Sequence, residues 1–166
     1  MREPGSWVLL TYKLPRDPST PRSSVWRKLR RLGVAQLADG LVALPEDART
    51  REQLEWIADE VLAAGGTAML WSARPTAIGD ERSIAAQMSA DRSREYAELT
   101  ARATVALEAP SVEQRRAIRS LRTELRAVRR RDYFSADGKQ AAVQAVDALA
   151  RMVAATEEPA ASGVRR

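Results

Sequence analysis

The first half of the chain alternates short apolar runs with stretches in which apolar residues recur every three or four positions. The apolar runs are rich in β-branched or aromatic residues and end at turn residues, which predicts strands at residues 7–14, 34–37, 41–44 and 67–72. The three-and-four spacing between them predicts two amphipathic helices, at residues 20–32 and 50–64. The order strand, helix, strand, strand, helix, strand is the split βαβ pattern of ferredoxin-like folds.

Capping and turn residues mark the ends of several of these elements. Thr20 followed by Pro21 is a typical helix start, with threonine as N-cap and proline at the first helical position, and Gly33 ends that helix. Asp39-Gly40 predicts the hairpin between the second and third strands. Thr50 and Gln53 have the spacing of a capping box at the second helix.

Three tryptophans lie in or beside the predicted apolar faces. Trp26 falls on the apolar face of the first helix and Trp71 in the last strand, so we predict that both pack in the core. Trp56 is next to the apolar stripe of its helix, and we expect it to be partly exposed.

After Pro75 the strand signals stop and the pattern becomes helical. It predicts a long helix that begins at Asp80 and ends before Pro110, a helix from Ser111 to about Arg131, and a last helix over residues 139–155. We therefore predict an α+β fold with a three-helix C-terminal extension. Its parts are a ferredoxin-like domain at residues 1–74, a helical extension at 75–155 and a flexible tail at 156–166.

Cysteine and histidine are both absent from the 166 residues. Their absence excludes disulfides, thiolate nucleophiles and cysteine-rich zinc or iron–sulfur sites, and it removes the usual general base near neutral pH. A transition-metal site would have to rest on carboxylates alone. We therefore predict a protein that is not an enzyme, with no cofactor, no metal site and no catalytic residues.

The run Trp7–Tyr12 is too short for the core of a signal peptide or for a membrane span, and no later segment is uniformly apolar. We therefore expect a cytoplasmic protein without a membrane partner.

The charge of the chain suggests a polyanionic partner. Lys and Arg number 27 against 22 Asp and Glu, which gives a formal net charge of +5. Clustered cations gain affinity for nucleic acids by displacing the counterions of the phosphates. The placement of the cations along the chain therefore decides how far DNA is favoured.

The most basic segment is residues 113–131, which reads as a helix with two adjacent faces. Apolar side chains follow one seam, while arginines repeat the same spacing one face further round, and the acids Glu113 and Glu124 fall on the opposite side. Guanidinium groups grip phosphate oxygens in a fork geometry, so we predict that this arginine ridge, with Arg130 beside it, binds DNA. The apolar seam is Ile118, Leu121, Leu125 and Val128, and the arginine ridge is Arg115, Arg119, Arg122, Arg126 and Arg129.

A second basic cluster lies on the first helix, whose apolar face has to cover the sheet. Most of this cluster should form a solvated outer face, and it could add to one DNA-binding surface if it shares a side of the molecule with the ridge. Its members are Arg22, Arg27, Lys28, Arg30 and Arg31.

Two other interpretations of the ridge stay open. Its arginines could lie over the apolar seam, or pair with acids on other helices, namely Asp59, Glu60, Glu95 or Glu98. Guanidinium groups could also bind a smaller oxyanion, for which Arg92 and Arg94 are further candidates.

The chain resembles the ChrB family of chromate-resistance regulators in three segments. The opening WVLLTYKLPRDPSTPRSSVWRKLRRLG with its DGLVALP hairpin is similar to the start of that family, and RSREYAEL and RRDYF resemble its helical extension in the same order. The resemblance implies a cytoplasmic transcriptional regulator that binds DNA and responds to chromate, without a cofactor. Longer family members carry a further C-terminal domain, which leaves chromate sensing by this chain open. The first half is also similar to the central domain of PaaX-type repressors.

Two functions of other classes compete with a DNA-binding regulator. The ferredoxin-like half is similar to the small metal-dependent nucleases of CRISPR adaptation, but Lys13 stands where a metal-binding carboxylate would be needed, and Asp17 lies beyond Pro15. Alternatively the chain is a protein-interaction or dimerisation module whose interface is the apolar seam. For a regulator we expect a homodimer, because regulators often match palindromic sites.

Overall fold

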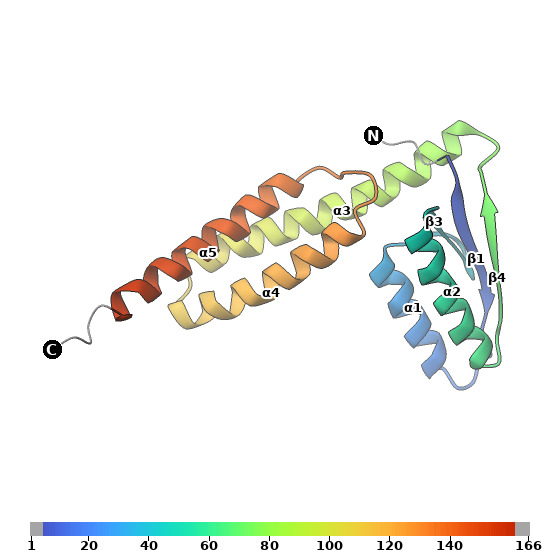
Figure 1. Cartoon of the computed structure of the whole chain (residues 1–166), viewed down its shortest axis with the longest axis horizontal. Helices are drawn as coiled ribbons and strands as arrows, with labels where there is room; N and C mark the ends of the chain where they lie inside the picture. The colour runs from blue at the N-terminus through green and yellow to red at the C-terminus, as the bar shows by residue number, and fades with distance from the viewer. Residues whose placement is uncertain (1–4, 162–166) are drawn as a thin grey trace. The chain divides into compact units, whose positions relative to one another are not determined.

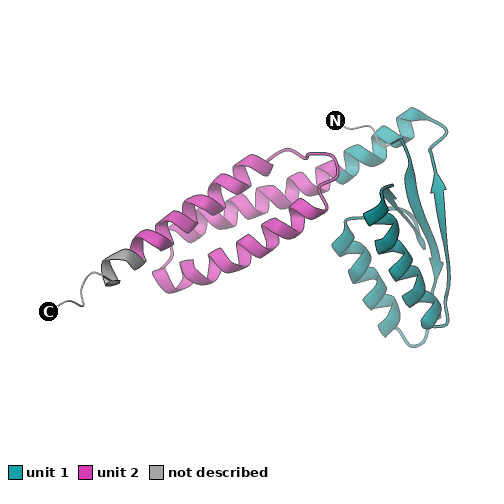
Figure 2. Ribbon diagram, viewed as in Figure 1, with its two compact units in different colours: residues 1–88 teal, residues 89–166 magenta. Residues whose placement is uncertain are grey.

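The computed structural model describes residues 5–161, with side chains for residues 5–156. It divides into two compact units, Met1–Met88 and Ser89–Arg166, and the boundary falls inside one long helix (Figure 2). The boundary predicted at residue 74 marks the end of the sheet. The early turns of the helix still belong to the first unit, where the Trp7 indole Nε1 donates to Glu81 Oε1 at 3.2 Å.

The first unit is a four-stranded antiparallel sheet with two helices on one face (Figure 1). The strands lie in the order β2-β3-β1-β4, which is the ferredoxin-like arrangement, so the predicted fold class is confirmed. The strands are β1 (Trp7–Lys13), β2 (Ala35–Ala38), β3 (Leu41–Pro45) and β4 (Thr67–Ala73), and the helices are α1 (Thr20–Leu32) and α2 (Ala48–Ala63).

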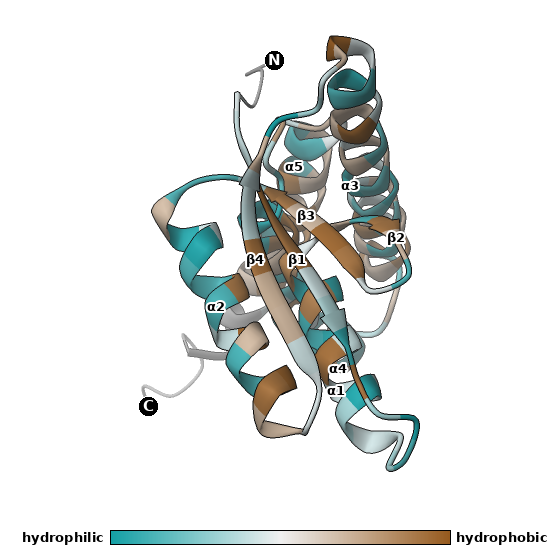
Figure 3. Cartoon of the chain, turned by 90° about the vertical axis from the view of Figure 1, so that its right-hand side faces the viewer, coloured by the Kyte–Doolittle hydropathy of each residue, from teal (hydrophilic) through white to brown (hydrophobic). Residues whose placement is uncertain are grey.

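The two faces of the sheet differ in what covers them. Val8 and Leu10 of β1 lie opposite Leu44 and Val42 of β3, and these four buried side chains form the core with α1 and α2. Figure 3 views the sheet from the side that α1 and α2 leave open. Trp71 lies on this open side, opposite Leu9, and is 50% exposed.

The core prediction for Trp71 is therefore wrong. Successive residues of a strand alternate between its two faces, and Trp71 belongs to the set that points away from the two helices. Trp26 is partly buried, and Trp56 is more exposed than expected, at 71%.

Both predicted N-caps are displaced. Ser19 is the N-cap of α1, so Thr20 is already helical, while Gly33 ends α1 as predicted with a φ of 73°. At α2 the Asp47 carboxylate accepts from Thr50 N, and the Thr50 hydroxyl accepts from Asp47 N. The capping box therefore starts one turn before the predicted Thr50 and Gln53 pair, because an aspartate in extended backbone competes better for the cap than a threonine already in the helix.

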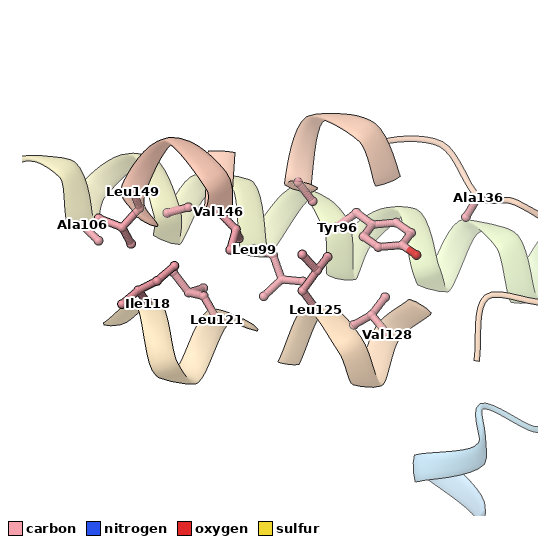
Figure 4. Packing of buried hydrophobic residues seen from close by; sticks show 12 residues of the cluster. Tyr96, Leu99, Ala106, Ile118, Leu121, Leu125, Val128, Ala136, Val146 and Leu149 are labelled. Carbon is pink, nitrogen blue, oxygen red and sulfur yellow. The ribbon is translucent and has the colours of Figure 1, made fainter. Parts of the chain in front are cut away.

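The described residues after β4 are mostly helical, as predicted, in α3 (Ile78–Leu107), α4 (Ser111–Arg130) and α5 (Lys139–Ala161), although α3 begins two residues before the predicted Asp80. In the second unit one apolar cluster joins the three helices through Tyr96 and Leu99 of α3, Leu121 of α4, and Val146 and Leu149 of α5 (Figure 4). Helix α5 continues beyond residue 155 to Ala161, so the first part of the predicted tail is helical, and residues 162–166 lie outside the described part. No helix among the described residues is long and apolar enough to cross a membrane.

Candidate nucleic-acid interface

Helix α4 turns its apolar seam into the second unit and its arginine ridge outward. Ile118, Leu121, Leu125 and Val128 are buried against α3 and α5, each with at most 8% exposure (Figure 4). Of the ridge, Arg119, Arg122, Arg126 and Arg129 are exposed, and Arg115 is half-buried. The two faces lie side by side because both follow the same three-and-four spacing, one residue apart.

The apolar seam is therefore already packed against α3 and α5 of the same chain. An interaction module that uses Ile118 to Val128 as its interface would have to open this core, so the structure contradicts that version of the alternative.

The ridge arginines reach few partners of their own. Arg126 Nη2 donates to Thr123 Oγ1 at 3.1 Å, on the same helix. Among the described residues, no ion pair joins Arg115, Arg119, Arg122, Arg126 or Arg129 to a carboxylate. Arg130, beside the ridge, is exposed and has interactions of its own.

None of the acids named as possible partners, Asp59, Glu60, Glu95 and Glu98, forms an ion pair with the ridge among the described residues. Glu95 binds Arg92 and Arg131, and Glu60 binds Lys28 of α1. The hydrogen bond to Glu124 raises the pKa of Arg102, burial opposes this, and the nearby Glu98 carboxylate adds a smaller increase. The ridge guanidinium groups are thus left for solvent or for an added anion.

Glu124 lies on the other side of α4 and contacts α3. Arg102 donates to both of its carboxylate oxygens, and Ser120 Oγ donates to Oε1 at 2.7 Å. The hydrogen bond from Arg102 holds the pKa of Glu124 below its usual value, although partial burial opposes this. The negative charge of Glu124 is therefore neutralised away from the ridge, as the helical spacing predicts.

At its C-terminal end the ridge reaches the start of α5. Arg129 lines a hollow of about 450 Å³ together with Gly138, Lys139 and Gln140, and Asp137 is the acid among its lining residues. The first turn of a helix presents backbone N–H groups that favour an anion. The hollow thus holds both basic side chains and an acid, and Lys139 Nζ lies 3.9 Å from Asp132 Oδ2.

A polar cluster fastens the end of α4 to α3. Glu95 bridges two arginines: Arg92 Nη2 donates to its Oε1 at 3.0 Å and Arg131 Nη2 to its Oε2 at 2.8 Å. Beside them the Tyr96 hydroxyl donates to Asp132 Oδ2 at 3.0 Å, and Asp132 Oδ1 accepts from Ala136 N at 2.9 Å. Burial, with the nearby Asp132 carboxylate, raises the pKa of Tyr96.

Sequence reasoning missed this cluster, although its signals were present. Arg92 and Glu95 stand three apart on one helix, a spacing that brings side chains together. The cluster draws its members from the segments RSREYAEL and RRDYF, so those two motifs meet in space.

The same cluster bears on the two oxyanion candidates. Arg92 is only 9% exposed and is bound to Glu95, while Arg94 is exposed but paired with Asp91. An oxyanion at either residue would have to compete with a carboxylate that is already in place.

The basic cluster of α1 lies in the first unit, and all five of its side chains are exposed. Three of them also make contacts within that unit. Arg22 donates to the Pro15 carbonyl at 2.8 Å, Arg27 to the Ser23 carbonyl at 3.3 Å, and Lys28 pairs with Glu60. Arg30 and Arg31 lie in the last turn of the helix.

Lys13 and Asp17 are the two residues that the sequence analysis considered for a nuclease site. Lys13 is exposed at the end of β1, and Asp17 is exposed in the turn that follows. Among the side chains that the structure describes, residues 5–156, no group of three or more carboxylates could hold a metal ion.

The comparisons with known proteins agree with the family resemblance of the three sequence segments. Residues 22–109, more than half of the chain, match the family model described as "Protein ChrB, N-terminal". The chain is 31% identical over 134 residues to Protein ChrB of Cupriavidus metallidurans, a match that covers 78% of this chain and 40% of the relative. The chain thus spans less than half of that relative's length, and no solved structure matches it. The resemblance predicted from the sequence is confirmed, and the chain belongs to the ChrB family.

Proposed function

We propose that this chain is a DNA-binding transcriptional regulator of the chromate-resistance type, which holds the phosphate backbone through the arginine ridge of α4. The observation that carries the proposal is the state of Arg119, Arg122 and Arg126, which are exposed in a row and unpaired with any carboxylate among the described residues. Family membership supports a role in chromate resistance.

The ridge suits the backbone of DNA better than a protein partner. Its side chains recur about one helical turn apart, on a helix whose central acid, Glu124, is bound by Arg102 of α3 on the other side. Arginines in such a row can each donate in a fork to successive phosphates. Contacts of this kind position a protein on DNA, whereas base contacts give the sequence preference.

The first prediction concerns the salt dependence of binding. The full chain should bind duplex DNA from the region upstream of its own gene, and the logarithm of the association constant should fall linearly with the logarithm of salt concentration. If four or five ridge arginines contact phosphates, the slope should be about −4, since each contact contributes about −0.9. Fluorescence anisotropy at several salt concentrations measures it, and binding that salt leaves unchanged would contradict a backbone interface.

A second prediction concerns the effector. If the chain itself responds to chromate or a similar oxyanion, the accessible donors are the ridge guanidinium groups, because Arg92 and Arg94 are held by carboxylates. Calorimetric titration should then show heat with both chromate and sulfate, and replacing Arg119, Arg122 and Arg126 by alanine should remove it. If neither chromate nor sulfate produces heat, direct sensing by this chain is excluded, and the DNA proposal is unaffected.

A further inference from the structure

Strand β4 is an unpaired edge of the sheet. It pairs with β1 on one side and has no strand of the described residues on the other, and Figure 3 shows it at the border of the sheet. Its seven residues, TAMLWSA, include no charged residue, proline or glycine. Met69 and Trp71 are 54% and 50% exposed. Natural edge strands usually carry charges or proline to prevent pairing with another strand, and β4 carries neither.

The outward-facing backbone groups of β4 follow from the pairing of β1. Tyr12 N donates to Gly40 O, and Glu46 N donates to Ser6 O, so the even-numbered residues of β1 face β3. The odd-numbered residues of β1 must then face β4, where Thr11 lies opposite Met69 and Leu9 opposite Trp71. The odd-numbered residues of β4 are therefore satisfied by β1, and the N–H and C=O groups of Ala68, Leu70 and Ser72 point out from the edge.

These three residues form a self-complementary edge, and we infer that β4 pairs with β4 of a second copy in antiparallel orientation, centred on Leu70. In this register Leu70 faces its own counterpart and Ala68 faces Ser72 of the other copy. All six outward N–H and C=O groups of each strand then find partners, as antiparallel pairing requires. The four-stranded sheets of the two copies join into one continuous sheet.

The same register pairs the exposed side chains. Met69 of each copy lies directly opposite Trp71 of the other, on the open side of the sheet. Directly opposed residues are the units of sheet stabilisation, and a methionine sulfur next to an indole ring is a favourable contact. Within the chain Trp71 Nε1 already donates to Thr11 Oγ1 at 3.2 Å, which fixes the ring over the open face.

A second copy fits this edge better than a strand of unrelated sequence. The two-fold arrangement brings no like charges together, because β4 has none, and it covers the two exposed large apolar side chains of the strand with each other. The inference does not depend on DNA binding, and it would stand if the ridge bound another polyanion.

Disulfide trapping tests the register, since the chain contains no cysteine. Met69→Cys and Trp71→Cys chains are prepared separately, then oxidised alone and as a mixture. Directly opposed residues of a non-hydrogen-bonded pair have Cα atoms about 4.5 Å apart, within disulfide range, whereas like positions in this register lie diagonally, about 7–8 Å apart. Cross-linked chains should form in the mixture and fall to trace amounts in either variant alone. Equal cross-linking of the separate variants, or none in the mixture, would overturn the inference.

Charge reversal provides a second, independent readout. Chains with Met69→Lys and Trp71→Lys, or with Met69→Glu and Trp71→Glu, should each sediment as a single chain of 18.3 kDa, while an equal mixture and the parent should sediment at twice that mass. Recovery of the dimer in the mixture distinguishes a broken interface from a broken fold. A parent that stays at the mass of one chain, or charged variants that remain dimeric alone, would contradict pairing through β4.

Discussion

Replacing Arg119, Arg122 and Arg126 together by alanine is expected to lower the affinity for duplex DNA by about two to three orders of magnitude at 0.1 M salt. Each lost phosphate contact removes about 0.9 from the slope of the logarithm of affinity against the logarithm of salt, and thus about 0.9 log units at this concentration. The slope should become less steep by about 3 for the same reason. The three side chains are exposed and make no ion pair with a described residue, so the fold should persist, which circular dichroism can check.

The α1 cluster provides a control of equal charge. A chain with Arg27, Arg30 and Arg31 replaced by alanine also loses three exposed cations, but from the first unit. We expect it to keep most of the affinity and the salt slope of the parent. Equal losses in the two triple variants would mean that net charge, and not the ridge, determines binding, and an unchanged ridge variant would refute the interface outright.

Of the replacements proposed here, Glu95→Ala should lower the free energy of unfolding the most. Glu95 accepts from both Arg92 and Arg131, and the Nε atoms of these two arginines are already buried without a hydrogen bond. Without the carboxylate, two largely buried guanidinium groups lose their acceptor. Because Glu95 keeps some exposure, we expect a cost of about 2–3 kcal/mol, below that of a fully buried pair.

Urea unfolding followed by far-UV circular dichroism measures this cost. Glu98→Ala is the matched control, since Glu98 lies one turn further along α3 and is exposed, and its loss should change stability by no more than about 0.5 kcal/mol. Similar stabilities for the two variants would show that the Glu95 bridge contributes little. The bridge matters for the ridge because it fastens Arg131, and with it the end of α4, to α3.

The fold was largely predictable from the sequence because its signals are local. The short apolar runs predicted the four strands, and the three-and-four spacing of apolar residues predicted the five helices. The errors occur where a local signal has a competitor one turn away, as Asp47 has at α2, or where burial depends on what covers a sheet. Trp71 has the composition of a core residue, but no element of the first unit covers its side of the strand enough to bury it.

The site was predictable only in part. The spacing within α4 separated seam from ridge, because both belong to one helix. The ion pairs Arg131–Glu95 and Arg102–Glu124 join two helices, which the sequence alone did not specify, whereas the pairs of Arg92 and Arg94 lie within α3 at a spacing of three and could have been predicted. Arg92 and Arg94 seemed free to bind an oxyanion until the structure placed Glu95 and Asp91 against them.

Arginine footprinting tests the central hypothesis most directly. The parent chain is labelled with a phenylglyoxal reagent, with and without saturating duplex DNA, and each arginine is followed by mass spectrometry. DNA should protect Arg119, Arg122 and Arg126, while the exposed Arg16 and Arg94 keep their reactivity. If the three ridge residues are labelled equally in both samples while the DNA is fully bound, the ridge is not the surface that holds it.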